Sequence, residues 1–273
     1  MNSKAPLNTT DMFRLDGQVA IITGAAGLLG LQHAIALSEF GASIVLTDLN
    51  VETCEQRAAQ MATQNQVKAI AVRSDVTQRA SWQTLLEQVM SQFGRVDILV
   101  NNAAFTTQTP SVDYDASFPD FPVEDWHRIL EVNLTGTFLG CQVVGMQMLE
   151  QRSGSIINMA SLYGVVSPNH RMYPGTGVHQ PAAYSVSKAG VIALTRYLAT
   201  LWADQGVRVN CITPGGVNNQ HPELFSHRYA TLSPIRRMAH KEEMRGALVY
   251  LASSASAYCT GHNLIVDGGW TAW

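Results

Sequence analysis

Short apolar segments rich in Val and Ile alternate along the chain with longer segments whose apolar residues recur at helical spacing. The short segments predict seven strands, at 18–23, 42–47, 67–72, 97–100, 155–159, 207–212 and 263–266. The longer segments predict helices at 28–40, 51–64, 78–93, 123–150, 183–204 and 241–253. Because continuous apolar strands separated by helices form parallel sheets covered on both faces, we expect an α/β fold, a doubly wound parallel sheet, in a single domain over residues 1–273.

The composition indicates a globular protein that acts on small molecules. Of its 273 residues 46% are hydrophobic and 14% charged, and a net charge of −3 without a basic run argues against nucleic acid as a partner. The polar start and the absence of a membrane-length apolar run predict a cytoplasmic protein that binds no membrane. The eight histidines lack metal-ligand spacing, so we expect no metal site. The cysteines are expected to be free, buried thiols.

A glycine-rich turn, TGAAGLLG at 23–30, joins the first predicted strand to the first predicted helix. Glycine lets a phosphate approach the backbone amides closely, and the helix N-terminus attracts the anion. The turn therefore predicts a dinucleotide site, with a ligand-free strand-to-helix turn as the alternative. The residues expected to contact the dinucleotide are Gly24, Gly27, Leu28, Leu29 and Gly30.

Asp48, at the end of the second predicted strand, bears on which dinucleotide binds. A carboxylate at this place accepts hydrogen bonds from the adenosine ribose and repels a 2′-phosphate. The nearest basic residue in the sequence, Arg57, lies well beyond it. We therefore predict NAD rather than NADP, the alternative being that Asp48 caps a helix or closes a turn.

Tyr184 and Lys188 are suited to proton transfer. They stand four residues apart in a predicted helix, so they share one face. A lysine ammonium beside a phenol favours the phenolate and lowers the tyrosine pKa. Such pairs occur by chance on many surface helices, so this one gains weight only from its context.

Further motifs follow a fixed order: SDV at 74–76, NNAA at 101–104, Asn133, Ser161, PGG at 214–216 and VDGG at 266–269. With the glycine turn and the Tyr184–Lys188 pair, they make the chain resemble the short-chain dehydrogenase/reductase family over nearly its whole length. The resemblance implies a Rossmann-like fold and an NAD-dependent oxidoreductase that interconverts a secondary alcohol and a ketone by hydride transfer. It also implies a homotetramer or homodimer formed through helices 123–150 and 183–204, whose apolar residues cover more than one face.

The resemblance assigns roles to single residues. Tyr184 would exchange a proton with the substrate oxygen, which Ser161 would also hydrogen-bond. Lys188 would lower the Tyr184 pKa and hold the nicotinamide ribose, and Asn133 would anchor a water that relays protons. Further cofactor contacts are implied for Leu49, Asp75, Val76, Asn102, Ala103, Pro214, Gly215 and Val217.

The glycine turn departs from the family pattern, because Leu28 stands at the middle glycine and Gly27 comes one place earlier. This spacing resembles the family's extended branch, which acts on nucleotide sugars. That branch carries a substantial C-terminal substrate domain, whereas here a short stretch follows PGG, so we predict the short branch. A nucleotide-sugar epimerase or dehydratase that recycles NAD internally remains an alternative, as does a non-catalytic nucleotide-sensing protein.

Two segments beyond an N-terminal extension at 1–14 bear on the substrate. Segment 162–182 is an insertion relative to the family and is predicted to form a polar pocket wall, or alternatively a surface or subunit-contact loop. Segment 217–240 is predicted to be a polar lid. Candidate substrate contacts are His170, Arg171, Tyr173, Asn219 and Gln220. These polar groups favour a sugar, a sugar acid or a related glycan precursor, with Arg171 suited to an anionic group.

Overall fold

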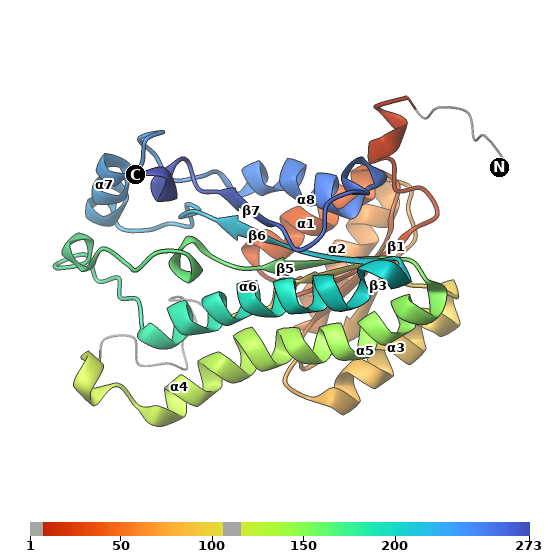
Figure 1. Ribbon diagram of the computed structural model, residues 1–273, viewed down its shortest axis with the longest axis horizontal. Helices are drawn as coiled ribbons and strands as arrows, with labels where there is room; N and C mark the ends of the chain where they lie inside the picture. Colours follow the sequence, from red (N-terminus) through yellow and green to blue (C-terminus); the bar gives the residue numbers. More distant parts are fainter. Residues whose placement is uncertain (1–7, 106–115) are drawn as a thin grey trace.

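The computed structural model describes residues 8–105 and 116–273, so residues 1–7 of the predicted extension and 106–115 of the loop after the fourth strand lie outside it. Seven parallel strands form one sheet in the order β3-β2-β1-β4-β5-β6-β7 (Figure 1). The strands are β1 (Val19–Thr23), β2 (Ser43–Asp48), β3 (Ala69–Arg73), β4 (Ile98–Asn101), β5 (Gly154–Met159), β6 (Val207–Pro214) and β7 (Asn263–Val266). The predicted strands and the doubly wound, Rossmann-like sheet are confirmed.

Helices cover both faces of this sheet. They are α1 (Leu28–Glu39), α2 (Val51–Gln64), α3 (Arg79–Phe93), α4 (Val123–Leu130), α5 (Gly136–Gln151), α6 (Ala182–Trp202), α7 (Glu223–Leu232) and α8 (Arg245–Ala252). Helices α1, α2 and α8 pack in one core, and α3, α5 and α6 pack in the other (Figure 1).

Strand β1 shows why its residues are apolar without a break. Ala20 and Ile22 belong to the core beneath α1 and α8, whereas Val19 and Ile21 belong to the core beneath α3 and α5. Both sets are buried because successive side chains of a strand point to opposite faces. The alternation of the two sets fixes the strand's register, since a slip by one residue would exchange them.

The predicted helix 123–150 is interrupted at Asn133, one of the predicted catalytic residues. A single π-helical turn, Glu131–Thr135, separates α4 from α5 and contains the fully buried Asn133. Turns of this kind hold one extra residue and are frequent at functional sites. The stretch Val123–Gln151 has the length and composition of a membrane span, but 50% of its most apolar window is buried, as in a core helix.

Two other segments differ from the sequence prediction. The predicted helix 241–253 begins as a 3₁₀ turn, Lys241–Met244, before α8. The segment 217–240 contains α7, which was not predicted because half of its residues are polar. Phe225 and Tyr229 lie one turn apart on α7, and both are buried against other aromatic side chains.

His33, on α1, is fully buried, and neither of its ring nitrogens has a hydrogen-bond partner in the described chain. Burial lowers its pKa from the usual 6.5 to about 4, because the interior disfavours the charged imidazolium. As pH falls through 6.5 the unfolded chain gains a proton that the folded chain does not accept until about pH 4. The free energy of unfolding therefore decreases across this window, by at most about 3 kcal/mol from this group.

Replacing His33 by Leu should remove this part of the acid sensitivity. We expect His33→Leu to lose about 2 kcal/mol less stability than the wild type between pH 7 and pH 4.5. Urea denaturation at both pH values measures the difference, and His33→Gln serves as a second, uncharged variant. Equal losses in the wild type and both variants would show that His33 is not a buried neutral group.

Candidate active site

The glycine turn requires two of its three glycines for steric reasons. Gly24 adopts φ +62°, and a Cβ there would lie 2.8 Å from the Ala103 Cα. A Cβ on Gly30 would collide with the Gly24 carbonyl oxygen and lie 2.8 Å from the Ala25 Cα. Gly27 is less constrained, since its Cβ would meet only the Gly24 oxygen, at 3.2 Å. Gly30 therefore permits the close approach of α1 to the turn after β1, and Gly24 permits that of the turn to the segment after β4.

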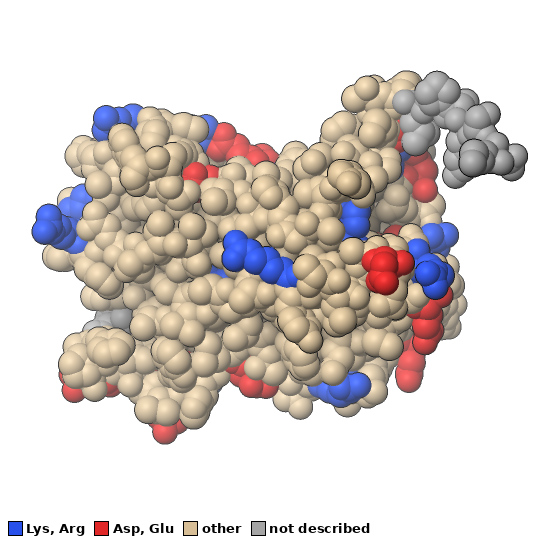
Figure 2. Space-filling model, viewed as in Figure 1, with Lys and Arg blue, Asp and Glu red and all other residues tan. Residues whose placement is uncertain are grey.

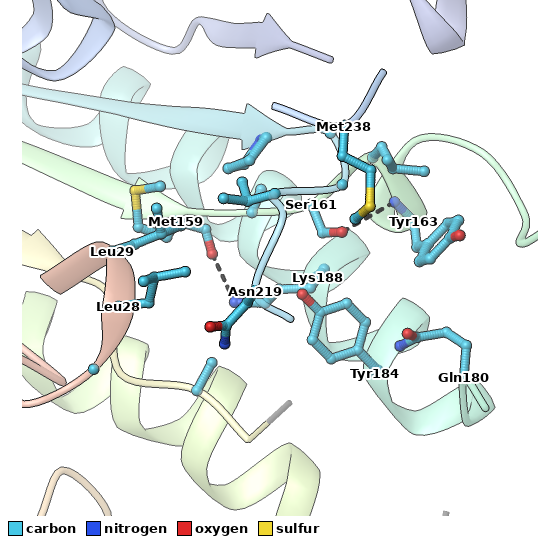
Figure 3. Close-up of a pocket in the computed structure, with 18 of the residues that line it drawn as sticks. Leu28, Leu29, Met159, Ser161, Tyr163, Gln180, Tyr184, Lys188, Asn219 and Met238 are labelled. Carbon is cyan, nitrogen blue, oxygen red and sulfur yellow. Dashed lines mark hydrogen bonds between the residues drawn. The ribbon is translucent and has the colours of Figure 1, made fainter. Parts of the chain in front are cut away.

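Leu28 occupies the place of the family's middle glycine and is the first residue of α1. Its side chain and that of Leu29 line the main cavity, on the side opposite Tyr184 (Figure 3). The backbone amides at the start of α1 remain those of a helix N-terminus, which is the feature that attracts a pyrophosphate. The shifted glycine thus adds an apolar side chain to the turn and leaves the helix N-terminus in place.

The turn is tied to the end of β4 through Thr23. Its hydroxyl accepts hydrogen bonds from the backbone amides of Asn102 at 2.9 Å and Ala103 at 3.0 Å. The Asn102 side chain donates to the carbonyls of Thr23 at 2.9 Å and Gly24 at 3.2 Å. Asn102 and Ala103, two of the predicted cofactor contacts, line the cavity with Gly24.

Asp48 lies at the end of β2 beside the glycine turn and also lines the cavity. Its carboxylate accepts from the backbone amides of Ala26 at 3.0 Å and Asn50 at 3.1 Å. The expectation that no basic residue lies near Asp48 is wrong. Arg57 extends back from α2 and donates to the carbonyls of Ala25 and, at 3.0 Å, Gly27, because α2 packs beside the turn.

Several predicted cofactor contacts lie outside the cavity. Asp75 binds the backbone amide of Thr77 at 2.9 Å, and Val76 packs against α5 at Gly136. Leu49 is exposed beside Asp48, and Gly30 is covered by the turn itself. Pro214, Gly215 and Val217 do line the cavity, at the end of β6.

Ser161, Tyr184 and Lys188 come together in the cavity from two elements (Figure 3). Ser161 follows the end of β5 and accepts a hydrogen bond from the Tyr163 amide at 3.2 Å. The ammonium of Lys188, on α6, donates to the Met159 carbonyl at 2.8 Å and lies 5.8 Å from the centre of the Tyr184 ring. Burial lowers the Lys188 pKa to about 8, because the ammonium has lost its water.

The Tyr184 pKa differs from the sequence prediction. We expected Lys188 to lower it, but burial of the phenol raises it above its usual value, and the hydrogen bond with Ser161 opposes that rise only in part. The Lys188 ammonium is directed to the Met159 carbonyl rather than to the phenol oxygen. Tyr184 is therefore a protonated phenol at neutral pH.

Asn133 does not line the cavity but is hydrogen-bonded to residues next to it. Its side-chain oxygen accepts from the Phe105 amide at 2.7 Å, and its amide donates to Ser187 at 3.2 Å. The Ser187 hydroxyl donates in turn to the Tyr184 carbonyl at 2.7 Å. The π turn that holds Asn133 thus connects the segment after β4 to the start of α6.

The cavity has a volume of about 450 Å³, and part of its wall is aromatic. The residues of this part are Tyr163 and Tyr173 from segment 162–182, Phe225 and Tyr229 from α7, and Met238 from the stretch after α7. Of these wall residues, only Tyr173 was predicted from the sequence as a substrate contact. The signal for two others was present, since Phe225 and Tyr229 recur at helical spacing.

His170 and Arg171 do not line the cavity, which corrects the prediction of a polar wall built on them. Asn169 caps a 3₁₀ turn by accepting from the Arg171 amide at 3.1 Å. This turn directs Met172 and Tyr173 inward and leaves His170 and Arg171 exposed. Arg171 therefore cannot anchor an anionic group of a substrate in this cavity.

The predicted lid contributes to two hollows. Asn219 and His221 line the main cavity, and the Asn219 side chain lies between Leu28 and Tyr184 (Figure 3). Gln220 instead lines a second, shallower hollow with Leu28 and Lys241. Asn219 is therefore the predicted lid contact that reaches the site, and Gln220 is not.

The comparisons with known proteins agree with this geometry. The family model described as enoyl-(acyl carrier protein) reductase matches residues 24–271. The chain belongs to the short-chain dehydrogenase/reductase family. Members of this family bind a nicotinamide cofactor, and the chain is accordingly an oxidoreductase that acts on CH–OH groups.

Three relatives within the short-chain dehydrogenase/reductase family are polyol dehydrogenases. D-threitol dehydrogenase of Mycolicibacterium smegmatis is 39% identical over 264 residues, covering 95% of each chain. NADP-dependent mannitol dehydrogenase of Alternaria alternata is 34% identical and covers 95% of this chain and 94% of its own. The crystal structure of NAD⁺-bound xylitol dehydrogenase matches with a TM-score of 0.83 at 31% identity, over 93% of this chain and 99% of that one.

The glycine turn offers a first test of the site. We expect Gly30→Ala to weaken NAD binding at least tenfold and to destabilise the fold by about 1–3 kcal/mol, since the added methyl separates α1 from β1. Gly27→Ala is the matched control and should change both quantities far less. Calorimetric titration with NAD and thermal unfolding measure the two effects. Equal behaviour of the two variants would contradict the steric argument.

Proposed function

We propose that this protein is an NAD-dependent dehydrogenase that interconverts a secondary alcohol and a ketone on a polyol or related sugar. One observation carries the proposal: Ser161, Tyr184 and Lys188 meet in a cavity bounded by the glycine turn on one side and by phenol-bearing aromatic residues on the other. The names of the polyol dehydrogenases among its relatives support the same substrate class.

The cavity suits a nicotinamide dinucleotide. Gly24 and Leu28 would hold the pyrophosphate at the start of α1, Asp48 the adenosine ribose, and Gly215 the nicotinamide end. A nicotinamide bound there would exchange a hydride with the carbon that carries the reacting oxygen. The protein's own residues then have to orient that oxygen and to move its proton.

Tyr184 is the group that moves the proton. In ketone reduction negative charge develops on the substrate oxygen, and the protonated phenol donates to it while the Ser161 hydroxyl stabilises it. In alcohol oxidation the phenol must first lose its proton, so this direction is favoured as pH rises. Lys188 lies next to this step, and its charge is lost as pH rises through about 8.

Asn133 acts on Tyr184 through Ser187 and does not itself line the cavity. It holds Ser187, which binds the backbone carbonyl of Tyr184, and therefore fixes the first turn of α6 relative to the loop after β4. This arrangement supports a positioning role in addition to the water-anchoring role that the family resemblance implies.

NAD is the cofactor that we propose, although relatives use either form. Asp48 lines the cavity at the end of β2, where its negative charge repels a 2′-phosphate. Arg57 lies nearby, but its guanidinium is engaged by the turn carbonyls of Ala25 and Gly27. We infer that Arg57 serves chiefly to hold the turn and that Asp48 sets the preference.

Removing the Asp48 charge should therefore change cofactor choice. We expect Asp48→Asn to lower the ratio of kcat/KM for NAD to that for NADP by about tenfold or more, because repulsion of the 2′-phosphate is lost. Arg57→Gln is the companion variant and should lower kcat/KM with both cofactors, since it loosens the turn. A wild-type enzyme that prefers NADP would overturn the assignment of NAD.

The function itself is tested by absorbance at 340 nm with NAD and a panel of polyols, sugars, sugar acids and nucleotide sugars. Tyr184→Phe should reduce turnover by about 10² to 10⁴-fold, because the proton donor is lost. Tyr258→Phe, at a fully exposed position, is the control and should be unaffected. Ser161→Ala should shift the alkaline rise of oxidation to higher pH, since the Ser161 hydrogen bond lowers the Tyr184 pKa.

Two alternative functions give different results in this experiment. An epimerase or dehydratase that recycles NAD internally would convert a nucleotide sugar without net reduction of NAD. A nucleotide sensor would bind NAD and convert nothing, and Tyr184→Phe would leave it unchanged. Turnover of a polyol with accumulation of NADH would contradict both alternatives.

We also propose that the protein is a homodimer or homotetramer assembled through α5 and α6. Their outer faces carry the exposed apolar residues Phe138, Met146, Val186, Tyr197 and Leu201. Figure 2 shows few charged side chains over these two helices on the face it presents. An apolar helix face of this kind supports contact with a second copy of the chain.

A further inference from the structure

Gln180 is a buried hydrogen-bond donor without an acceptor. It lines the cavity just before α6, and its amide nitrogen has no hydrogen-bond partner among the described residues. Figure 3 shows this amide beside the Tyr184 ring, with its nitrogen turned toward the ring. A buried donor left unpaired costs about 1–3 kcal/mol, so its presence at the site requires a reason.

The phenols of Tyr163 and Tyr173 supply a second unused donor. Their oxygens lie 2.6 Å apart in one hydrogen bond, which uses one of the two hydroxyl hydrogens. The other hydrogen has no acceptor among the described side chains. Burial raises the pKa of Tyr163 far above its usual value and that of Tyr173 to about 12, so both phenols keep their hydrogens at neutral pH.

Both donors lie close to the reacting group. Tyr163 lies near enough to Tyr184 for the charge of a Tyr184 phenolate to add to the rise of the Tyr163 pKa, which burial chiefly causes. Gln180 precedes Tyr184 by one turn and is separated from α6 only by the capping residue Pro181. Gln180 and Tyr163 both lie on the side of Tyr184 away from Leu28 (Figure 3), so a substrate that extends to that side of the cavity would meet both donors.

The charges that line the cavity indicate whether the substrate oxygen bound by these donors belongs to a hydroxyl or to an anionic group. Lys188 is the only Lys or Arg that lines it among the described residues, and its ammonium is bound to the Met159 carbonyl. His221 stacks on Phe225, and burial lowers its pKa, so it is neutral at pH 7. A carboxylate or phosphate on the substrate would find no free cation here, whereas a hydroxyl needs only neutral donors.

We propose that Gln180 and the Tyr163–Tyr173 phenol pair bind a second hydroxyl of the substrate, on the carbon next to the one that reacts. The substrate is then a neutral vicinal diol, and its product the corresponding hydroxyketone. This inference rests on the proposed dehydrogenase function and narrows its substrate class from polyols and related sugars to substrates that present two adjacent neutral hydroxyls.

A pair of alcohols that differ by one hydroxyl tests the subsite. With NAD, we would compare 2,3-butanediol with 2-butanol, and include D-threitol as a longer diol. We expect Gln180→Leu to reduce kcat/KM for the two diols about 5- to 100-fold, mainly through KM, because a hydroxyl loses its donor. Activity with 2-butanol should stay within about twofold of the wild type, whether that activity is high or low.

Tyr163→Phe and Gln60→Leu complete the set. Tyr163→Phe removes the free phenol hydrogen and should produce the same loss with the diols and not with 2-butanol. Gln60→Leu, at an exposed position on α2, is the matched control and should change neither substrate. Equal losses with diols and 2-butanol in Gln180→Leu, or no loss at all, would overturn the subsite.

Failure of the proposed function has a different signature. If the wild type oxidises none of these alcohols, the dehydrogenase proposal for polyols fails, and the subsite is judged by binding alone. Calorimetry would then measure D-threitol binding to the NAD-saturated wild type and to Gln180→Leu. Binding that the variant loses supports the subsite, whereas equal binding or none in the wild type overturns it.

Discussion

The hydrogen bond from the Lys188 ammonium to the Met159 carbonyl is the interaction on which the site depends. It joins α6, which carries Tyr184, to the end of β5. Ser161 follows two residues after that end. A buried ammonium is costly unless it is hydrogen-bonded, so this contact fixes where the helix can lie. The position of Tyr184 relative to Ser161 is thus set by a charge that the fold must satisfy.

Buried amide side chains near the carboxyl ends of β4 and β5 also fix the position of α6. Asn101 donates to Asn158 at 2.9 Å, and Asn158 donates to Thr195 on α6 at 3.0 Å. Together with Asn133, these side chains connect β4, β5 and α6 through polar contacts that have only a few acceptable geometries. Apolar packing positions the helices approximately, and these amides specify how they are aligned.

The sequence predicts the sheet and the reacting groups but not the substrate wall. Strands such as β1 are recognisable because burial on both faces demands continuous apolar residues. Arg57 could not be assigned to the glycine turn, since that contact arises only when α2 packs beside it. The outward position of Arg171 likewise depends on a short turn capped by Asn169, whose geometry leaves no periodic pattern in the sequence.

The aromatic wall forms a hydrophobic cluster of its own, separate from the two cores that sandwich the sheet. Tyr229 stacks on Trp270 at 4.5 Å between ring centres, so residues near the C-terminus help to close it. Because the wall shares no core residues with the sheet, its side chains can be exchanged with little effect on the packing that holds the cofactor turn. Substrate preference can therefore change largely without the glycine turn. Tyr229 is the exception, because its hydroxyl accepts a hydrogen bond from the Gly216 amide at 2.6 Å and couples the wall to the turn after β6.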